Sequence, residues 1–163
     1  MWRNNFEYAF ITPHNSNEEP PFNELFLLGG GYSLRGYRSG RVGTTKYSNY
    51  TYNYLTGRKT SPLTADDAKK ASDIPYGGRQ KVLYQMEFEF PLVAEAGIKG
   101  VTFYDVGLAN DLIMESEFYG DVGFGFRCFS PLGPLRFEWG FPMRQVTNSP
   151  DPSVFEFSIG APF

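Results

Sequence analysis

The last nine residues of the chain alternate strictly between two kinds of side chain. Counted back from the C-terminus, every second residue is apolar: Phe163, Ala161, Ile159, Phe157 and Phe155. The residues between them are small or polar: Pro162, Gly160, Ser158 and Glu156. A period of two is the pattern of a β-strand with one apolar and one polar face. A strand that runs to an aromatic last residue is unusual for a water-soluble protein, whose termini fray.

Five further segments show the same alternation and predict strands. The six predicted strands cover about residues 3–12, 81–90, 98–108, 121–130, 135–143 and 154–163. In the fourth of these, Val122, Phe124 and Phe126 share one face, and the other face holds glycines and charged residues. No segment carries the pattern of a long amphipathic helix. The sequence therefore predicts an all-β, antiparallel chain.

Alternation alone fits two environments, because a soluble sandwich buries the apolar face whereas a membrane barrel turns that face to lipid. No run of about 18 apolar residues exists, so the sequence contains no candidate transmembrane helix. Mean hydropathy is −0.36 although 18% of the residues are aromatic, which is compatible with a barrel, where only alternate residues are apolar. The net charge of −3 argues against a nucleic-acid partner.

The lengths of the connections favour the barrel. The segment 13–80 is very long, 91–97 is short, 109–120 is medium, 131–134 is very short and 144–153 is medium. Long and short connections thus alternate, as in outer-membrane barrels with long extracellular loops and short periplasmic turns. We expect a bacterial outer-membrane protein with a periplasmic C-terminus and an extracellular 13–80 loop.

Five motifs occur in order along the chain. They are GGGYSLRGY at 29–37, MEFEFP at 86–91, FYDVG at 103–107, GFGFR with SPLGPLR at 123–136, and the terminal strand. Together they resemble the signatures of the outer-membrane protein insertase superfamily. The SPLGPL stretch is more similar to the BamA family than to the two-partner-secretion transporters.

The resemblance implies a transmembrane β-barrel of about sixteen antiparallel strands, of which this chain would be the C-terminal six. Six strands are too few to close a barrel. The periplasmic POTRA domains and the first barrel strands would be absent from the chain. Met1 is not followed by an apolar signal segment, which also leads us to expect a fragment of a longer protein.

The resemblance also assigns roles to residues of the long loop. Its motif, which in the family folds back into the barrel lumen, is Leu34, Arg35, Gly36 and Tyr37. Family membership implies that the Arg35 guanidinium pairs inside the barrel with two acids of the wall, Glu87 and Asp105. Without the family context, a solvated loop arginine would be the simpler interpretation. A bidentate arginine–carboxylate pair would fix the loop more sharply than a lysine could.

The terminal strand has its own implied role. In the family the first and last strands meet at a weak lateral seam, which here would involve Phe155, Phe157, Ile159, Gly160 and Phe163. The implied partners are nascent outer-membrane proteins, outer-membrane lipids, accessory lipoproteins of the assembly complex and the remaining barrel strands. Three functions stay open: an insertase, a secretion pore that exports a passenger through the lumen, and a simple porin or structural barrel, which the loop motif disfavours.

No signature of catalysis accompanies these features. The sequence lacks GxSxG, HExxH and any His/Cys spacing suited to a metal. The lone His14 lies among turn-forming residues. The glycine run 29–31 is not followed by a phosphate-binding GK(S/T) sequence. We expect no enzyme activity, no metal and no cofactor.

The alternating connections predict the topology. Residues 131–134 and the C-terminus should be periplasmic, and 109–120 and 144–153 should be extracellular with 13–80. Cysteines placed at Ser130 and Ser149, after Cys128 is changed to serine, should differ in reactivity toward an impermeant maleimide on intact cells. We expect labelling only at position 149, and labelling only at position 130 would reverse the orientation.

Overall fold

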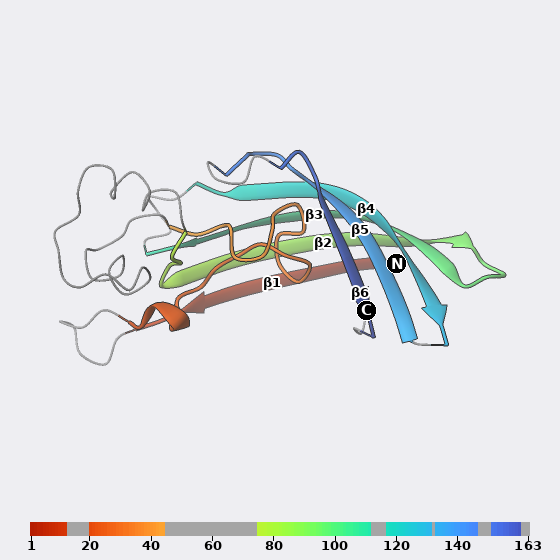
Figure 1. Cartoon of the computed structure of the whole chain (residues 1–163), viewed down its shortest axis with the longest axis horizontal. Helices are drawn as coiled ribbons and strands as arrows, with labels where there is room; N and C mark the ends of the chain where they lie inside the picture. Colours follow the sequence, from red (N-terminus) through yellow and green to blue (C-terminus); the bar gives the residue numbers. More distant parts are fainter. Residues whose placement is uncertain (13–19, 45–74, 112–116, 132, 147–150, 161–163) are drawn as a thin grey trace.

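A computed structural model describes residues 1–12, 20–44, 75–111, 117–131, 133–146 and 151–160 of the 163-residue chain. One antiparallel sheet of six strands dominates it, in the order β1-β2-β3-β4-β5-β6 (Figure 1). The strands are β1 (Trp2–Phe10), β2 (Gln80–Val93), β3 (Ile98–Asn110), β4 (Tyr119–Ser130), β5 (Gly133–Pro142) and β6 (Val154–Ile159). A short 3-10 helix, η1 (Phe22–Glu24), precedes β2. Among the described residues, no helix is long and apolar enough to cross a membrane.

All six predicted strands are present, and the all-β antiparallel prediction is confirmed. The largest difference at a described boundary is in β2, which continues past Phe90 to Val93. The register of β2 against β3 shifts between Pro91 and Val93. Pro91 has no N–H to donate, so the ladder continues through an irregularity rather than ending at the proline. Residues 161–163 of the predicted last strand lie outside the described residues.

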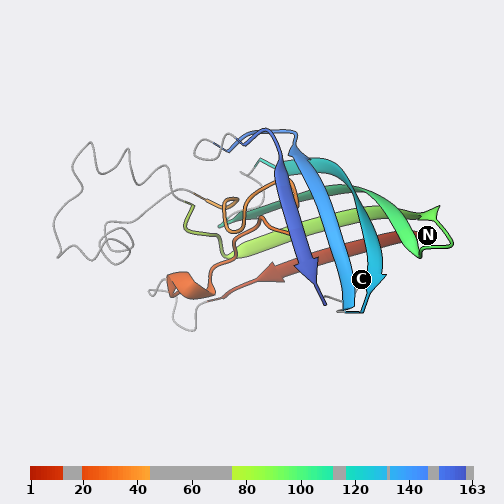
Figure 2. The same ribbon diagram turned by 45° about the vertical axis from the view of Figure 1, so that its right-hand side comes forward.

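The sheet does not close. Each strand pairs with the next one in sequence, which leaves β1 and β6 as the two edges. The sheet is strongly curved, so that β5 and β6 cross in front of β1, β2 and β3 (Figures 1 and 2). The orange trace that follows η1 lies within this curve in both views, whereas η1 itself lies beyond the end of β1. The chain therefore forms part of a curved wall with a loop on its concave side.

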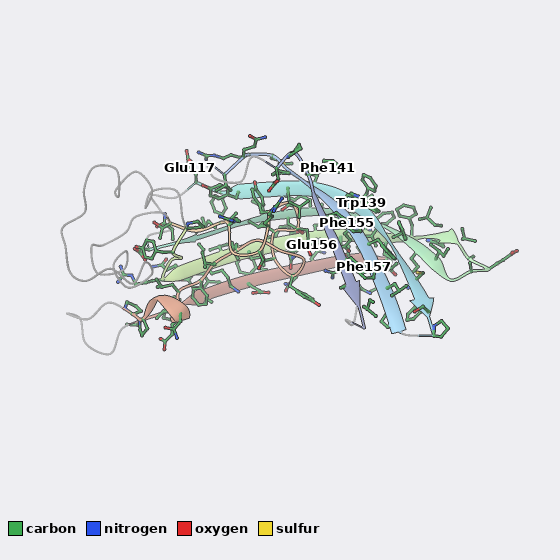
Figure 3. The ribbon with its side chains drawn as sticks, viewed as in Figure 1. Glu117, Trp139, Phe141, Phe155, Glu156 and Phe157 are labelled. Atoms are coloured by element: carbon green, nitrogen blue, oxygen red, sulfur yellow. The ribbon has the colours of Figure 1, made fainter. Side chains whose placement is uncertain are left out.

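The convex face of the sheet carries a band of aromatic rings. Phe126 stacks on Phe137 with ring centroids 4.7 Å apart, and Trp139 lies 4.9 Å from Phe155. Figure 3 labels Trp139 on β5 and Phe155 on β6, with Phe157 two residues further along β6. Phe124 is 53% exposed and Phe155 is 52% exposed. A continuous exposed apolar band of this kind suits contact with lipid acyl chains.

The concave face holds the apolar core of the described chain. Leu28, Leu34, Tyr37 and Val42 of the loop segment pack against Leu83 on β2, and further buried members are Ala109 and Val146. The loop is also held by backbone bridges from Phe26 to Gly78 and from Leu28 to Val42. This core therefore lies between the loop and the sheet, and the loop is a structural layer of the wall.

Substitutions on the two faces should act through different physical causes. In the full-length protein in lipid, Phe126→Arg should lower the free energy of unfolding by roughly 2–4 kcal/mol, because a charge would face acyl chains. The neighbouring Gly125→Ala should act through packing, because an added Cβ would lie 2.3 Å from the Phe137 carbonyl oxygen. Urea unfolding in vesicles measures both, with Phe126→Leu as the control. Near-normal stability of the arginine variant would contradict the lipid assignment.

Candidate functional site

The loop segment turns sharply before its arginine. Gly29 and Gly30 have φ of 109° and 96°, which strain residues with a side chain. The Gly30 N–H points to the carbonyl oxygens of Tyr37 at 2.7 Å and Leu34 at 3.2 Å. This arrangement closes a tight loop around residues 30–37, so that Leu34 and Arg35 project toward the sheet and become fully buried.

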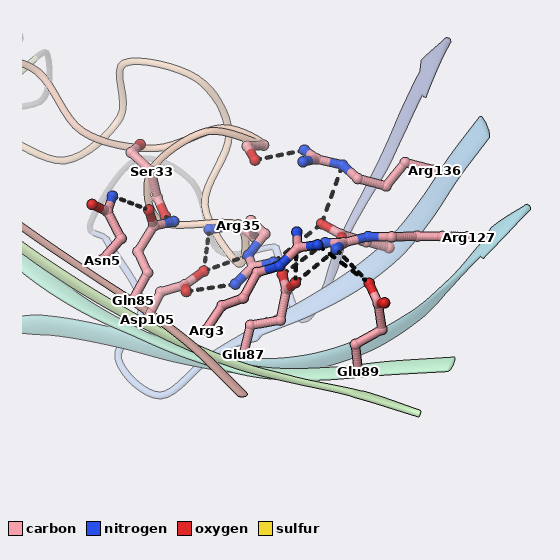
Figure 4. Close-up of polar contacts among 12 residues, drawn as sticks. Arg3, Asn5, Ser33, Arg35, Gln85, Glu87, Glu89, Asp105, Arg127 and Arg136 are labelled. Atoms are coloured by element: carbon pink, nitrogen blue, oxygen red, sulfur yellow. Dashed lines mark hydrogen bonds and ion pairs between the residues drawn. The ribbon is translucent and has the colours of Figure 1, made fainter. Parts of the chain in front are cut away.

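Arg35 binds acids from two neighbouring strands (Figure 4). Its Nε and Nη2 donate to the two carboxylate oxygens of Asp105 on β3, at 2.7 and 2.8 Å. Its Nη1 donates to Glu87 on β2 at 2.9 Å. The guanidinium carbon also lies 3.7 Å from the centroid of the Phe103 ring. The structure thus brings Arg35 together with both acids that the motif resemblance named.

A second arginine completes the charge network from the wall itself. Arg127 on β4 donates to both oxygens of Glu87, at 2.6 and 2.7 Å. It also donates to Glu138 on β5 at 2.8 Å. Glu138 in turn lies 3.5 Å from Arg35. Glu87 is therefore shared between one arginine of the loop and one of the sheet.

The burial of these groups decides how strongly they bind the loop. The Arg35 residue is only 3% exposed, and Asp105 is fully buried. Burial alone would lower the pKa of the Arg35 guanidinium, but the hydrogen bonds and charges of Asp105, Glu138 and Glu87 raise that pKa above its ordinary value. The side chain stays charged, and a buried charge must keep its partners.

Gly36 sits where the loop backbone meets the sheet. A Cβ added to Gly36 would lie 2.5 Å from Cβ of Asp121 on β4, and one added to Gly140 on β5 would lie 2.6 Å from Cα of Gly36. Only two residues without side chains permit this approach. Asp121 is itself fully buried, so a side chain at position 36 would find no free space on this side.

Tyr37 ties the end of the motif to β4 and to the segment after β5. Its hydroxyl lies 2.8 Å from the carbonyl oxygen of Arg144 and 3.0 Å from that of Gly120. Its ring meets Tyr119 edge-on, with centroids 5.9 Å apart. Burial raises the pKa of the Tyr37 hydroxyl to about 12, so it acts as a neutral donor. Each residue from Leu34 to Tyr37 thus contacts the wall or the loop core.

The residues assigned to the seam lie on β6 and just after it. Phe155, Phe157 and Ile159 point to the convex face and are half exposed. In the described chain β6 pairs with β5 alone. Gly160 follows the strand with φ of 75° and donates its N–H to the Pro134 carbonyl at 2.9 Å. Phe163 lies outside the described residues.

Sequence reasoning did not single out three members of the site. Arg127, Glu138 and Asp121 fall on the polar faces that alternation predicts. That signal places them on the concave side. It does not show which of them meet, because the contacts from β4 and β5 depend on strand register and on the curvature of the sheet.

An open antiparallel sheet with an apolar outer face, a charged inner face and a loop docked inside is the wall of an outer-membrane-type β-barrel. The Omp85 superfamily domain matches residues 2–163, and the chain belongs to this superfamily. The family is non-enzymatic. Among the described residues, no group of three His, Cys, Asp or Glu side chains could hold a metal ion.

Several known proteins are similar to this chain. The outer membrane protein assembly factor BamA of Nitratidesulfovibrio vulgaris is 29% identical over 90% of the chain and 16% of that protein. BamA of Neisseria meningitidis serogroup B is 26% identical over 96% of the chain and 21% of that protein. Outer envelope protein 80, chloroplastic, of Arabidopsis thaliana is 28% identical over 84% of the chain and 15% of that protein. The chain thus spans about a fifth or less of these relatives.

The fold has a counterpart among solved structures. The crystal structure of BamA from Haemophilus ducreyi lacking POTRA domains 1–3 superposes with a TM-score of 0.60 and 21% identity. The match covers 96% of this chain and 33% of that one. The open sheet therefore corresponds to part of a BamA barrel, and the relatives' names refer to the bacterial outer membrane or the chloroplast envelope.

The geometry of Arg35 predicts a large and local effect of its removal. In the full-length protein, Arg35→Ala should cost on the order of 3–5 kcal/mol of loop binding, because it leaves buried acids uncompensated. The loop should become sensitive to protease. Arg38→Ala is the matched control: this arginine of the same loop is 64% exposed and pairs with Asp151, so its loss should cost at most about 1 kcal/mol. Unchanged protease resistance of the Arg35→Ala protein would refute the role.

Proposed function

We propose that this chain is the C-terminal segment of a barrel that folds and inserts outer-membrane proteins, and that clients enter at a lateral seam formed by its last strand. The observation that carries the proposal is the loop of residues 26–44, buried on the concave face through Arg35 in a chain of the Omp85 superfamily. The names of the bacterial relatives support it, because both are assembly factors.

The edge of β6 supplies the chemistry of the proposed seam. Backbone N–H and C=O groups in a bilayer have no water to bind, so an unpaired edge there is costly. The edge of β6 that faces away from β5 must therefore pair with the first barrel strand, with a strand of a client or with a second copy of itself. β6 covers only Val154–Ile159, and Gly160 and Pro162 weaken pairing beyond it. A short seam needs few bonds to open, and no nucleotide or cofactor enters this step.

The inner network keeps the wall rigid while the seam opens. Arg127 links β4 to acids of β2 and β5, and the docked loop adds bonds from Arg35 to β2 and β3. Opening is thereby confined to the edge of the sheet that carries few such links. In this proposal the chain lies in the bacterial outer membrane with a periplasmic C-terminus and an extracellular 13–80 loop. Its partners are client strands, membrane lipids, accessory lipoproteins and the earlier strands of the same barrel.

A covalent lock tests the seam. In the full-length protein with Cys128 changed to serine, a disulfide between β6 and the first barrel strand should block client insertion, and reductant should restore it. The control is a disulfide within the terminal hairpin, between Leu135→Cys and Ile159→Cys, which are register partners and leave the seam free. Client assembly into vesicles is the measurement. Full activity of the seam-locked protein would favour the alternative, export of a passenger through the lumen.

A further inference from the structure

The tip of the docked loop contacts the last two strands through side chains that the Arg35 network does not include. Arg136 projects from the concave face of β5, and its Nη2 donates to the Gly31 carbonyl oxygen at 2.6 Å (Figure 4). Its guanidinium carbon lies 5.2 Å from the centroid of the Tyr32 ring. Its Nε lies 3.5 Å from Glu138 on the same strand, which fixes the direction of the side chain.

β6 reaches the same point of the loop. A Cβ built on Gly31 would lie 2.9 Å from Arg136 Nη2 and 3.5 Å from Glu156 Oε2. Gly31 therefore fits between a side chain of β5 and a side chain of β6. Four residues further along the loop, Arg35 binds Glu87 on β2 and Asp105 on β3 and lies 3.5 Å from Glu138 on β5. The loop spans the concave face from the middle of the sheet to its edge.

We propose that Arg136 is a positioning residue that couples the seating of the loop to the pairing of β6. This inference rests on the proposed function, because it concerns how the seam is regulated. The loop acts as a strut beside the Arg127 bridge from β2 to β5. If β5 and β6 move away from β2 and β3, the Arg136–Gly31 contact must break or Arg35 must leave its site. By linkage, a seated loop holds the seam strand in place, and an opened seam weakens the loop.

Within the described part of the chain, an ion pair also joins the loop to the segment before β6, and we expect it to be weaker than the Arg136–Gly31 hydrogen bond. Arg38 binds Asp151 with atoms 2.7 Å apart, but the arginine side chain is 64% exposed. Solvent-exposed pairs contribute little. The Arg136 side chain is 11% exposed, and its hydrogen bond is charge-assisted, which makes it the stronger connection.

Hydrogen exchange of the full-length protein in lipid nanodiscs tests the coupling. In an otherwise wild-type protein, Arg35→Ala should speed exchange of the 154–159 amides about tenfold, because the strut is lost. Arg136→Ala should by itself speed exchange of these amides by a similar factor. In the Arg136→Ala background, Arg35→Ala should add less than about twofold, because the link is already broken. Equal factors in both backgrounds, or no change in β6 with either variant, would overturn the proposal.

Two further variants test whether the effect of Arg136→Ala is specific to its contact with Gly31. Gly31→Ala should reproduce Arg136→Ala, because its methyl group displaces the guanidinium, and the two together should not add. An added effect of Gly31→Ala in the absence of the Arg136 guanidinium would count against the contact. Lys99→Ala is the matched control: Lys99 is a concave-face cation that pairs with Glu89 at 2.8 Å, and its loss should leave β6 exchange unchanged. An equal acceleration by Lys99→Ala would reduce Arg136 to a general structural role and overturn the proposal.

Exchange is measured without a client, so this proposal and the proposed function can fail separately. A protein that shows the non-additivity but inserts no client would remove the assembly function and keep the coupling. A protein that assembles clients normally but in which the effects of the two variants on exchange are additive would keep the assembly function and remove the coupling.

Discussion

The structure depends on one interaction, the burial of the Arg35 guanidinium among acids of the wall. Its bidentate contact with Asp105 and its bond to Glu87 supply the charged hydrogen bonds that a buried arginine requires. The acids in turn need the positive charge of Arg35, because several carboxylates share the concave surface and repel one another. Arg127 lowers that repulsion but comes from the sheet and cannot hold the loop. The loop is therefore retained by an electrostatic demand of the wall as well as by its own apolar contacts.

The apolar contacts of the loop follow from the orientation of the sheet, which turns its aromatic face outward and its charged face inward. Outward aromatic rings such as Phe124 and Trp139 pair with one another along the convex face and suit lipid. They contribute nothing to an inner core. The loop supplies that core, with Leu28, Leu34 and Val42 packed on Leu83. The alternation of the strands thus leaves the concave face without an apolar core of its own, and residues 26–44 supply one.

Much of the fold follows from the sequence because strands and their faces depend only on local alternation. Alternation along 121–130 predicts Phe126 on one face and the charged residues on the other, and the structure buries Arg127 on the concave side. The pairing of Arg35 with Glu87 and Asp105 came from motif resemblance, not from spacing. Neither alternation nor motif resemblance predicts the contacts of Arg127 and Arg136, because these contacts join different strands and depend on the curvature of the sheet. Close approaches such as Gly36 against Gly140 are likewise set by three-dimensional packing alone.

The shared acids have a consequence for the maturation of the protein itself. Glu87 and Asp105 lie on the concave face only when β2 and β3 pair in the observed register, since a slip of one residue turns each side chain to the other face of the sheet. Arg35 would then meet aromatic or aliphatic neighbours in place of carboxylates and could not stay buried. Docking of the loop thus depends on strand register: only the observed alignment of β2 and β3 offers Arg35 both of its carboxylates.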